Sequence, residues 1–526
     1  MVVKPITCQP AFFIFLFTLL CVPDTYSLLL LHSLIPLLKV FSGFFICYLL
    51  AFPVVFMPSK WSKCYKILLC IFASLFFVID ISLLLLYDES FGTISKDAIA
   101  AVLATNPDEV QEYFDSYFTA DKLLIVLVLM SVLWIVFYYL RKLDLEFKNI
   151  GILCLLALLS VSVVITFAKL DKIEESNFYY LLTKDCPDLC EYKQNPNVVC
   201  TVDGVKNIVL VVGESFTKFQ SSLYGYDKDT NPRLERLRKD SILFVYENIT
   251  SAYVTTIPSI KSIMMSYVDS MCDSIEWYRC LTLLEIMQKS GYRTYWISNQ
   301  SKTGIYDNEV GRFADLCDCQ VFIGDKNSGL SRSTKDEGLL PVVEKCLSED
   351  SLSKFVVVQM MGSYAAYVQR YPSSFAKFRG SDYDNTHSHL SPDKRQVIAE
   401  YDNSLLYNDS VACELMRMSE QDEVVVIYLS DHGEDVFRSS DDICGHSQGL
   451  NEYHTEVVQQ IPFMVYTTRF FREKHPELQR RIESSVNRPY RTDSIMYTIM
   501  DVAGVESVNG VSYKHKSLFK KQVGYW

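Results

Sequence analysis

Two short segments, each after an apolar run, combine the residue types that hold a divalent metal. After Ile208–Val212 the chain reads GES, which places Glu214 at the end of a predicted strand. After Val424–Leu429 it reads SDHGED, which places Asp431 and His432 at the end of another. Carboxylate oxygens and an imidazole nitrogen are standard zinc ligands, and catalytic zinc keeps one position for a reacting group. The segments therefore predict a metal site, although a Glu after a strand is also common as a surface residue or helix cap.

A metal site that transfers a chemical group needs a nucleophile, and residues 250–266, TSAYVTTIPSIKSIMMS, offer one. A turn-like stretch leads there into an amphipathic run. A threonine at such a helix start can place its hydroxyl on the metal, while the helix N–H groups and dipole favour phosphate oxygens. From these residues alone, Thr255 or Thr256 is more commonly a simple helix cap.

The elements that must position these side chains are four apolar runs, which we predict to be buried parallel strands with helices between them. Such alternation favours an α/β sheet covered by helices on both faces, and ligands bind beyond the carboxyl ends of its strands. The runs are Ile208–Val212, Tyr295–Ser298, Phe355–Met361 and Val424–Leu429.

The first part of the chain is dominated by Leu, Ile, Val and Phe and predicts a membrane domain. A membrane helix needs about 20 mostly apolar residues. Pro23 and Asp24 interrupt the first candidate, which could instead be a signal peptide, but four more candidates follow and no clean cleavage site is visible. The predicted helices are about 10–31, 35–57, 66–87, 122–140 and 150–168.

Charge bias in the loops predicts the orientation. The loops between helices 2 and 3 and between helices 4 and 5 are basic, whereas residues 88–121 are rich in Asp and Glu. The positive-inside rule then places the basic loops in the cytoplasm and everything beyond the fifth helix outside it. We therefore predict a transmembrane domain at 1–169, a linker at 170–200 and a soluble catalytic domain at 201–526.

The composition disfavours one class of binding partner, and the cysteine count suggests disulfides. The net charge of −12 disfavours a nucleic-acid partner, which would require a basic face. The chain has 16 cysteines, and a domain outside the cytosol permits disulfides, although connectivity cannot be read from sequence. Cys272 and Cys280 are near enough to pair across a short loop, and buried thiols are the alternative for any one cysteine.

Taken together, these segments resemble the phosphoethanolamine transferases, membrane enzymes of the alkaline phosphatase/sulfatase superfamily. That group includes the lipid A modifying enzymes and the mobilised colistin-resistance enzymes. The resemblance covers most of the chain and lies in the order and spacing of a five-helix start and several motifs. These are NIVLVVGES (Asn207–Ser215), LYGYDKDTNPRL (Leu223–Leu234), TTIPSIKSIM (Thr255–Met264), YWISNQ (Tyr295–Gln300), DEGLL (Asp336–Leu340), MMGSYAAYVQRYP (Met360–Pro372), YDNSLLYND (Tyr401–Asp409) and YLSDHGED (Tyr428–Asp435).

The resemblance implies a role for individual residues. Glu214, Asp431 and His432 match the family's zinc ligands, and Thr256 matches its nucleophile, which also ligates zinc. Thr256 is preferred to its neighbour because the family pattern is Thr, two residues, then Ser, and Ser259 fits that spacing.

Further positions match substrate-binding residues of the family. His446, in CGHSQG, best matches a histidine near the reacting phosphate, with His454 as the fallback; both precede IPFMVY (Ile461–Tyr466), which resembles the family's next strand. In the acidic loop, Thr105 and Glu109 match positions implicated in holding the lipid headgroup. A solvated interfacial helix is the alternative for that loop.

One position departs from the family. A histidine that contacts the substrate phosphate or a second zinc is replaced by Tyr364, which we still expect at the substrate. A phenol is a poor zinc ligand at neutral pH, because its reference pKa is about 10. We therefore predict one zinc and doubt a permanently occupied second site. His387 and His389, in a loop, could replace the missing histidine, although the commoner interpretation is that they are surface residues.

The family implies a two-step transfer of phosphoethanolamine. Zinc-bound Thr256 attacks phosphatidylethanolamine, diacylglycerol leaves, and a cell-envelope glycan such as lipid A or the lipopolysaccharide core takes the group. The expected protein is a monomer in the bacterial inner membrane, multi-pass, with a periplasmic catalytic domain. The alternatives are a lipoteichoic-acid-type phosphoglycerol transferase and a non-catalytic envelope protein. Sulfatase activity is disfavoured because no C/S-x-P-S-R sequence occurs.

Overall fold

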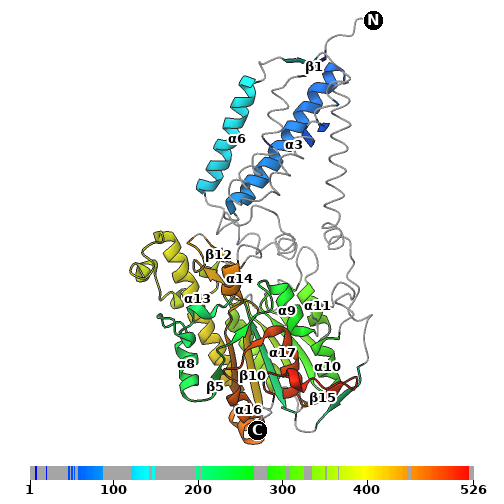
Figure 1. The fold of residues 1–526 in the computed structure, drawn as a ribbon, viewed down its shortest axis with the longest axis vertical. Coiled ribbons are helices and arrows are strands. Elements are labelled where there is room, and N and C mark those ends of the chain that lie inside the picture. The colour runs from blue at the N-terminus through cyan, green and yellow to red at the C-terminus, as the bar shows by residue number, and fades with distance from the viewer. Residues whose placement is uncertain are drawn as a thin grey trace. The chain divides into compact units, whose positions relative to one another are not determined.

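The computed structural model divides into two compact units (Figure 1). The first consists of residues 1–102 and 110–185, and the second of residues 103–109 and 186–526. Of the first unit the structure describes residues 57–86, 120–140 and 145–147, together with a few positions before them. Of the second it describes residues 196–520 apart from short gaps at 202–203, 266–280, 303–308, 325–334, 350–351, 365, 442 and 447–451.

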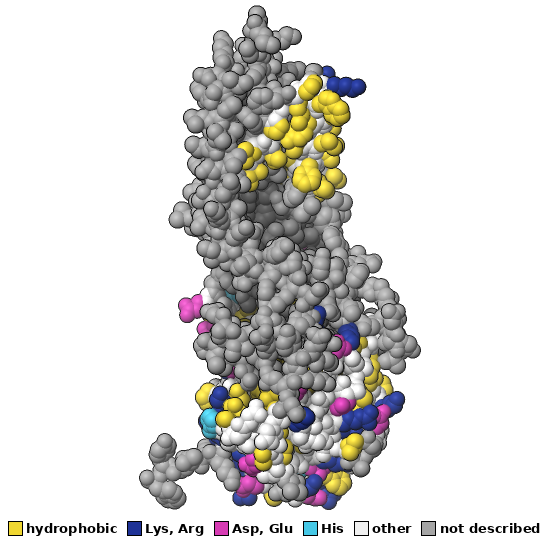
Figure 2. Space-filling view, turned by 90° about the vertical axis from the view of Figure 1, so that its right-hand side faces the viewer, with side chains coloured by type: hydrophobic (Ala, Val, Ile, Leu, Met, Phe, Trp, Pro, Cys, Tyr) yellow, Lys and Arg dark blue, Asp and Glu magenta, His cyan; other side chains and the backbone are white. Residues whose placement is uncertain are grey.

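The described part of the first unit contains two helices and a pair of short strands. Helix α3 (Ser59–Leu86) packs against α6 (Ala120–Leu140), and strand β1 (Ile6–Cys8) pairs antiparallel with β2 (Leu145–Phe147). Many of the leucines, isoleucines and valines of both helices are exposed. Figure 2 shows these hydrophobic side chains crowded on the described surface of this unit.

These helices coincide with two of the five predicted spans, 66–87 and 122–140. The other three, 10–31, 35–57 and 150–168, lie largely outside the described residues. Within the described residues, no helix combines the length and the apolar character that crossing a membrane requires. The membrane domain and its orientation therefore stay a prediction.

A seven-stranded mixed sheet forms the centre of the second unit, in the order β5-β13-β10-β4-β9-β7-β8. The five strands from β10 to β8 are mutually parallel. Strand β13 is antiparallel to both of its neighbours, β10 and the edge strand β5, so β5 runs in the same direction as the five. All four predicted parallel strands are confirmed, and IPFMVY forms β13. The bounds are β4 Asn207–Gly213, β5 Leu243–Val245, β7 Arg293–Ser298, β8 Cys319–Phe322, β9 Lys354–Gln359, β10 Val424–Ser430 and β13 Phe463–Thr467.

Helices cover both faces of this sheet, as predicted (Figure 1). Successive residues of a strand point to opposite faces, so Ile208 and Leu210 join one hydrophobic core while Val209 and Val211 join the other. On the first face lie α9 (Thr256–Met264), α10 (Leu283–Lys289), α11 (Glu309–Asp315), α15 (Arg469–Lys474), α16 (Pro476–Ser484) and α17 (Ile495–Val502). On the second lie α8 (Pro232–Lys239), α12 (Leu340–Ser348) and α13 (Pro392–Met418).

Helix α13 is long and carries a row of buried polar side chains. It begins where Ser391 accepts a hydrogen bond from the backbone of Lys394 and Pro392 occupies the first turn, a favourable helix start. Asp409 accepts the backbone N–H groups of Arg233 and Leu234 and thus caps α8. The buried polar side chains of α13 therefore bind neighbouring segments by hydrogen bonds, while its apolar side chains pack against the sheet.

Short strands complete the second unit, and one of them lies before the predicted start of the soluble domain. Strand β3 (Val198–Cys200) pairs with β15 (Val505–Val508), so the folded unit reaches back to Val198, slightly before the predicted boundary at 201. The remaining short strands are β6 (Ile249–Thr250), β11 (Asp435–Val436), β12 (Cys444–Gly445) and β14 (Tyr490–Arg491), and α14 (Glu452–Gln459) follows β12.

The disulfide expectation fails for the cysteines that the structure describes in this unit. Two of them, Cys346 and Cys413, lie buried in the hydrophobic core, where a thiol behaves as a small apolar side chain. The described cysteines of the unit are present as thiols, and they are Cys200, Cys317, Cys319, Cys346, Cys413 and Cys444. Cys272 and Cys280, the suggested pair, lie outside the described residues.

Candidate metal centre

The carboxyl ends of two neighbouring strands bring the predicted ligands together. Strands β4 and β10 are parallel and adjacent, with Gly213 opposite Ser430 in the register. The next residues, Glu214 and Asp431, therefore leave the sheet side by side although they are far apart in sequence. This is the edge at which ligands bind in open α/β sheets.

The three predicted ligands converge in the interior. Nε2 of His432 lies 3.4 Å from Oε1 of Glu214 and 3.4 Å from Oδ2 of Asp431. The exposed fractions of Glu214, Asp431 and His432 are 2%, 0% and 0%. Their donor atoms lie within 4.8 Å of one another, close enough to hold one ion. Buried charges of this kind are costly unless they are paired or coordinate a metal.

The backbone after β4 is held in an unusual conformation that aims Glu214. Ser215 has a φ of 55°, in the left-handed region. Its carbonyl accepts a hydrogen bond from the Tyr401 hydroxyl at 2.7 Å, and its N–H donates to Oδ1 of Asp431 at 3.2 Å. A non-glycine residue keeps such a conformation only where its surroundings fix it, and such positions cluster at functional sites.

A glycine makes room behind this ligand. Gly362 has a φ of 54°, and a Cβ added to it would come within 2.6 Å of the Glu214 carbonyl oxygen. Asp336 accepts the N–H groups of Met361 and Gly362 at 2.9 and 2.8 Å and holds the loop in place. Only glycine fits this close approach without strain.

The histidine has a defined tautomer. Nδ1 of His432 lies 2.8 Å from the carbonyl oxygen of Gly433, which can only accept, so Nδ1 carries the hydrogen. Nε2 is then the nitrogen with a lone pair, and it faces Glu214 and Asp431. Backbone carbonyls commonly orient metal-binding histidines in this way.

A threonine hydroxyl reaches the same point from α9. Oγ1 of Thr256 lies 3.3 Å from each carboxylate oxygen of Glu214 and 3.2 Å from Nε2 of His432. Thr256 is the first residue of the helix, and Thr255 is its N-cap. Within the described part of the chain, the Thr255 side chain makes no capping hydrogen bond. The structure therefore brings Thr256, rather than Thr255, to the predicted ligands.

The donor set fits a zinc ion. Oδ2 of Asp431 is buried and has no hydrogen-bond partner among the described residues. Burial raises the pKa of Glu214, but His432 and His446 more than offset it and lower this pKa to about 2. Burial and the charge of Glu214 raise the pKa of Asp431 well above its usual value. The two carboxylates thus resist being charged together, and a divalent cation would relieve that conflict.

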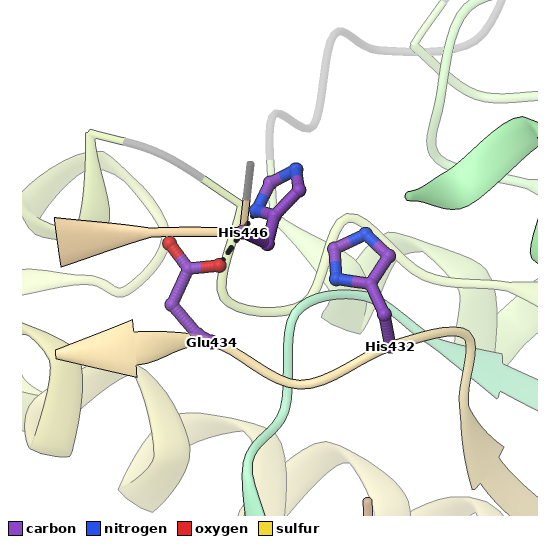
Figure 3. Close-up of side chains that lie close together, drawn as sticks. All are labelled: His432, Glu434 and His446. Carbon is purple, nitrogen blue, oxygen red and sulfur yellow. Dashed lines mark hydrogen bonds and ion pairs between the residues drawn. The ribbon is translucent and has the colours of Figure 1, made fainter. Parts of the chain in front are cut away.

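A second group of side chains adjoins the ligands. Nδ1 of His446 lies 2.7 Å from Oε2 of Glu434, and the Tyr367 hydroxyl donates to Oε1 of Glu434 at 2.6 Å. The rings of His446 and His432 are 4.1 Å apart at their centroids. Figure 3 shows His446 turned towards Glu434 beside His432. Of the two predicted histidines, His446 is therefore the one at the centre.

His454, the fallback, is placed elsewhere. Its Nδ1 lies 2.8 Å from Oδ2 of Asp435, and both residues are fully buried. Oδ1 of Asp435 also accepts the N–H groups of Arg438 and Ser439. This pair is satisfied within the protein and is a structural contact.

The other predicted residues are only partly located. Tyr364 is partly exposed, and the Arg370 guanidinium lies 5.9 Å from its ring centroid. His389 forms an exposed ion pair with Asp441, as expected of a surface histidine. Thr105 and Glu109 lie outside the described residues.

Sequence reasoning missed three side chains that support the centre. It gave no role to Glu434 or Tyr367, and it named Gln300 only as the end of a motif. Nε2 of Gln300 donates to Oε2 of Glu214 at 3.0 Å. A signal was present, because Gln300 follows β7, which ends at the same edge of the sheet as β4 and β10. Polar residues at that edge are candidates for the site.

Similarity to known proteins agrees with this geometry. The chain is 26% identical over 454 residues to phosphoethanolamine transferase EptC of Escherichia coli K12, which covers 80% of this chain and 76% of that protein. The crystal structure of the C-terminal periplasmic domain of Escherichia coli EptC in complex with Zn superposes with a TM-score of 0.54 and 25% identity, over 63% of this chain and 90% of that one. The resemblance predicted from the motifs is thereby confirmed.

The fold of the whole chain also has a counterpart. The integral membrane protein lipooligosaccharide phosphoethanolamine transferase A of Neisseria meningitidis superposes with a TM-score of 0.66 and 17% identity, over 97% of both chains. A family model described as sulfatase matches residues 206–505, which span the sheet and every ligand located above. The chain therefore belongs to the sulfatase family.

Proposed function

We propose that this protein transfers phosphoethanolamine from phosphatidylethanolamine to a cell-envelope glycan, lipid A or the lipopolysaccharide core, through a covalent intermediate on Thr256. The observation that carries the proposal is the Thr256 hydroxyl, 3.3 Å from Glu214 and 3.2 Å from His432, at the start of a helix. The names of the relatives above support the choice of group. We further propose that the protein acts in the bacterial inner membrane with this unit in the periplasm.

The residues present fit one zinc ion, with Glu214, Asp431, His432 and Thr256 as its ligands. When bound, zinc would act as a Lewis acid that lowers the pKa of the threonine hydroxyl and polarises a phosphoryl oxygen. Thr256 then bonds to phosphorus as the bond to the diacylglycerol oxygen breaks. The start of α9 offers backbone N–H groups to the phosphoryl oxygens.

The group around His446 handles the proton. Glu434 accepts from Nδ1, which leaves Nε2 for the substrate, and Tyr367 fixes Glu434 from its other side. His446 gives a proton to the departing diacylglycerol oxygen and takes one from the acceptor hydroxyl in the second step. Thr256 is released when the acceptor oxygen bonds to phosphorus.

Intact mass spectrometry of the purified full chain tests this function. After incubation with zinc and phosphatidylethanolamine, the wild type and Thr255→Ala should carry a phosphoethanolamine adduct, and Thr256→Ala should not. An adduct on Thr256→Ala would exclude Thr256 as the nucleophile. An adduct formed only with phosphatidylglycerol would favour the phosphoglycerol alternative. Zinc binding without any adduct from either lipid would overturn the proposal.

A further inference from the structure

The Glu214 carboxylate is held by an amide at its oxygen Oε2. Nε2 of Gln300 donates to this oxygen at 3.0 Å and to the carbonyl oxygen of Met360 at 3.0 Å. Both hydrogens of the amide are therefore used. Oε1 of Glu214, by contrast, is the oxygen that lies 3.4 Å from His432. Oε1 also accepts from the Ser215 hydroxyl at 3.0 Å, and the Thr256 hydroxyl lies 3.3 Å from both oxygens. Gln300 thus fixes the carboxylate from its Oε2 side and leaves Oε1 facing His432.

The orientation of the Gln300 amide is itself fixed by a second amide. Oε1 of Gln300 accepts from Nε2 of Gln359 at 2.8 Å. Gln359 lies at the end of β9, between β4 and β7, and is buried. If Gln359 were turned over, its oxygen would face the oxygen of Gln300, and Gln300 would have to turn as well. Its own oxygen would then face the Glu214 carboxylate.

A third side chain fixes the orientation of the amides from the other end. Nε1 of Trp296 donates to Oε1 of Gln359 at 3.2 Å, and the Ser298 hydroxyl donates to the same oxygen at 3.2 Å. A hydroxyl can donate or accept, but an indole N–H can only donate. The indole therefore requires an oxygen opposite it. This places the Gln359 nitrogen towards Gln300, and so the Gln300 nitrogen towards Glu214.

We propose that Trp296, Gln359 and Gln300 form a directional relay of positioning residues that orients Glu214 for zinc. The inference rests on the zinc site of the proposed function. Trp296 is fully buried and contacts the ligand only through two intervening amides. A substitution there should nevertheless weaken zinc binding, because it removes a donor that, together with the Met360 carbonyl, opposes the inverted arrangement of the amides. Outer-shell partners of metal ligands are typically worth about 10–100-fold in metal affinity.

Zinc affinity of the purified full chain, measured by competition with a chromogenic chelator, tests the relay. Gln300→Met and Gln359→Met remove the amides with little change in volume, and Trp296→Phe removes only the indole N–H with part of the ring. Tyr246→Phe is the control, since it deletes a buried hydroxyl bonded to Ile482 and Ser485 in the same core. Thermal unfolding of the metal-free proteins shows whether each variant is folded.

We expect Gln300→Met to lower zinc affinity by about 10–100-fold, Gln359→Met and Trp296→Phe by about 3–10-fold, and Tyr246→Phe to leave it unchanged. Excess zinc should restore transfer by Gln300→Met, which a general loss of structure would not allow. Wild-type zinc affinity in folded Gln300→Met would overturn the relay, and so would wild-type affinity in folded Trp296→Phe. Failure of the proposed function is distinct, because it would appear as a missing adduct on the wild type, whereas the relay is measured by the zinc affinities of the variants relative to the wild type.

Discussion

Two buried carboxylate–imidazole clusters both draw on the segment SDHGED at residues 430–435, and they differ in how completely their carboxylates are paired. In the ligand cluster (Glu214, Asp431, His432), Oδ2 of Asp431 has no hydrogen-bond partner in the described part of the protein. In the structural pair, each oxygen of Asp435 is occupied, one by His454 and the other by two backbone N–H groups.

This difference in pairing distinguishes a cluster that could bind a ligand from one that stabilises the fold. A buried charge without its partners is costly, and evolution retains it where something binds there. A buried charge with all its partners holds the chain in place. Residue type and burial are the same in both clusters, so neither property alone identifies a site. What distinguishes these two clusters is the oxygen of Asp431 that lacks a hydrogen-bond partner among the described residues.

The comparison predicts its largest effect for Asp431→Asn. This variant removes a ligand charge, so zinc binding should be lost and transfer should fall by more than about 10³-fold. The metal-free protein should unfold no more easily than the wild type, because one of two conflicting buried charges is gone. Transfer assays, zinc content and thermal unfolding check this. Asp435→Asn is the contrast and should retain zinc; if it lost zinc as well, the two clusters would not be functionally separate.

The opposite result is expected for His454→Ala. Removing one partner of the fully buried pair leaves Asp435 uncompensated, which should cost about 3–5 kcal/mol in the free energy of unfolding. Zinc affinity of the folded variant should stay at the wild-type value. Denaturant unfolding measures the cost. His389→Ala, which breaks an exposed pair, is the matched control and should cost at most about 1 kcal/mol.

The variant His446→Ala distinguishes proton transfer from zinc binding within the candidate site. His446 is expected to move protons and not to hold zinc, so turnover should fall by at least about 10²-fold while zinc affinity is retained. Tyr367→Phe keeps the ring, which packs edge-on against Tyr401, and removes the O–H group that fixes Glu434. It should lower turnover about tenfold. Loss of zinc from His446→Ala would make this residue a ligand instead.

The smallest effect is a pH dependence at Asp402. This carboxylate accepts the hydroxyls of Tyr226 and Tyr383 and the amide of Gln220. Burial raises the pKa of Asp402 from 3.8 to about 7, although the hydroxyl donors lower it in part. The folded state therefore binds more protons than the unfolded state between these values. The stability that Asp402 contributes is present below pH about 4 and is lost as the pH rises through 7.

Asp402→Asn should remove this dependence. The unfolding free energy of the wild type relative to the variant should fall by about 1–3 kcal/mol between pH 5 and pH 8. Denaturant unfolding at several pH values checks it, and comparing the two proteins cancels the titration of all other groups. A parallel pH profile for both would show that Asp402 does not titrate in this range.

The convergence of the candidate ligands Glu214, Asp431 and His432 could be predicted from the sequence, because the position of each motif after a strand is a local property. GES and SDHGED each follow an apolar run, and parallel strands bring such ends to one edge. The choice of His446 over His454 and of Thr256 over Thr255 came from the family pattern, and the structure places both preferred residues at the centre. From the residues alone, each alternative stayed open.

The supporting side chains could not be predicted in the same way. The role of Gln300 depends on the register of β7 against β9, which places Ser298 opposite Gln359. The role of Tyr367 depends on a loop that carries Ala366 at a φ of 63°. Both roles arise from tertiary packing, which the hydrophobic periodicity of the sequence does not reveal.

The polar row on α13 has a consequence for how the protein matures. Tyr401 fixes the turn that aims Glu214, and Ser404 bonds Ser363 in the loop beside it. Glu214 and these contacts on α13 are separated by more than 180 residues of chain, so they meet only after most of the sheet has formed. We therefore expect zinc to bind at the end of folding, once the sheet and α13 have packed together and the site is complete. A chain in which α13 has not yet packed against this loop should therefore not hold zinc.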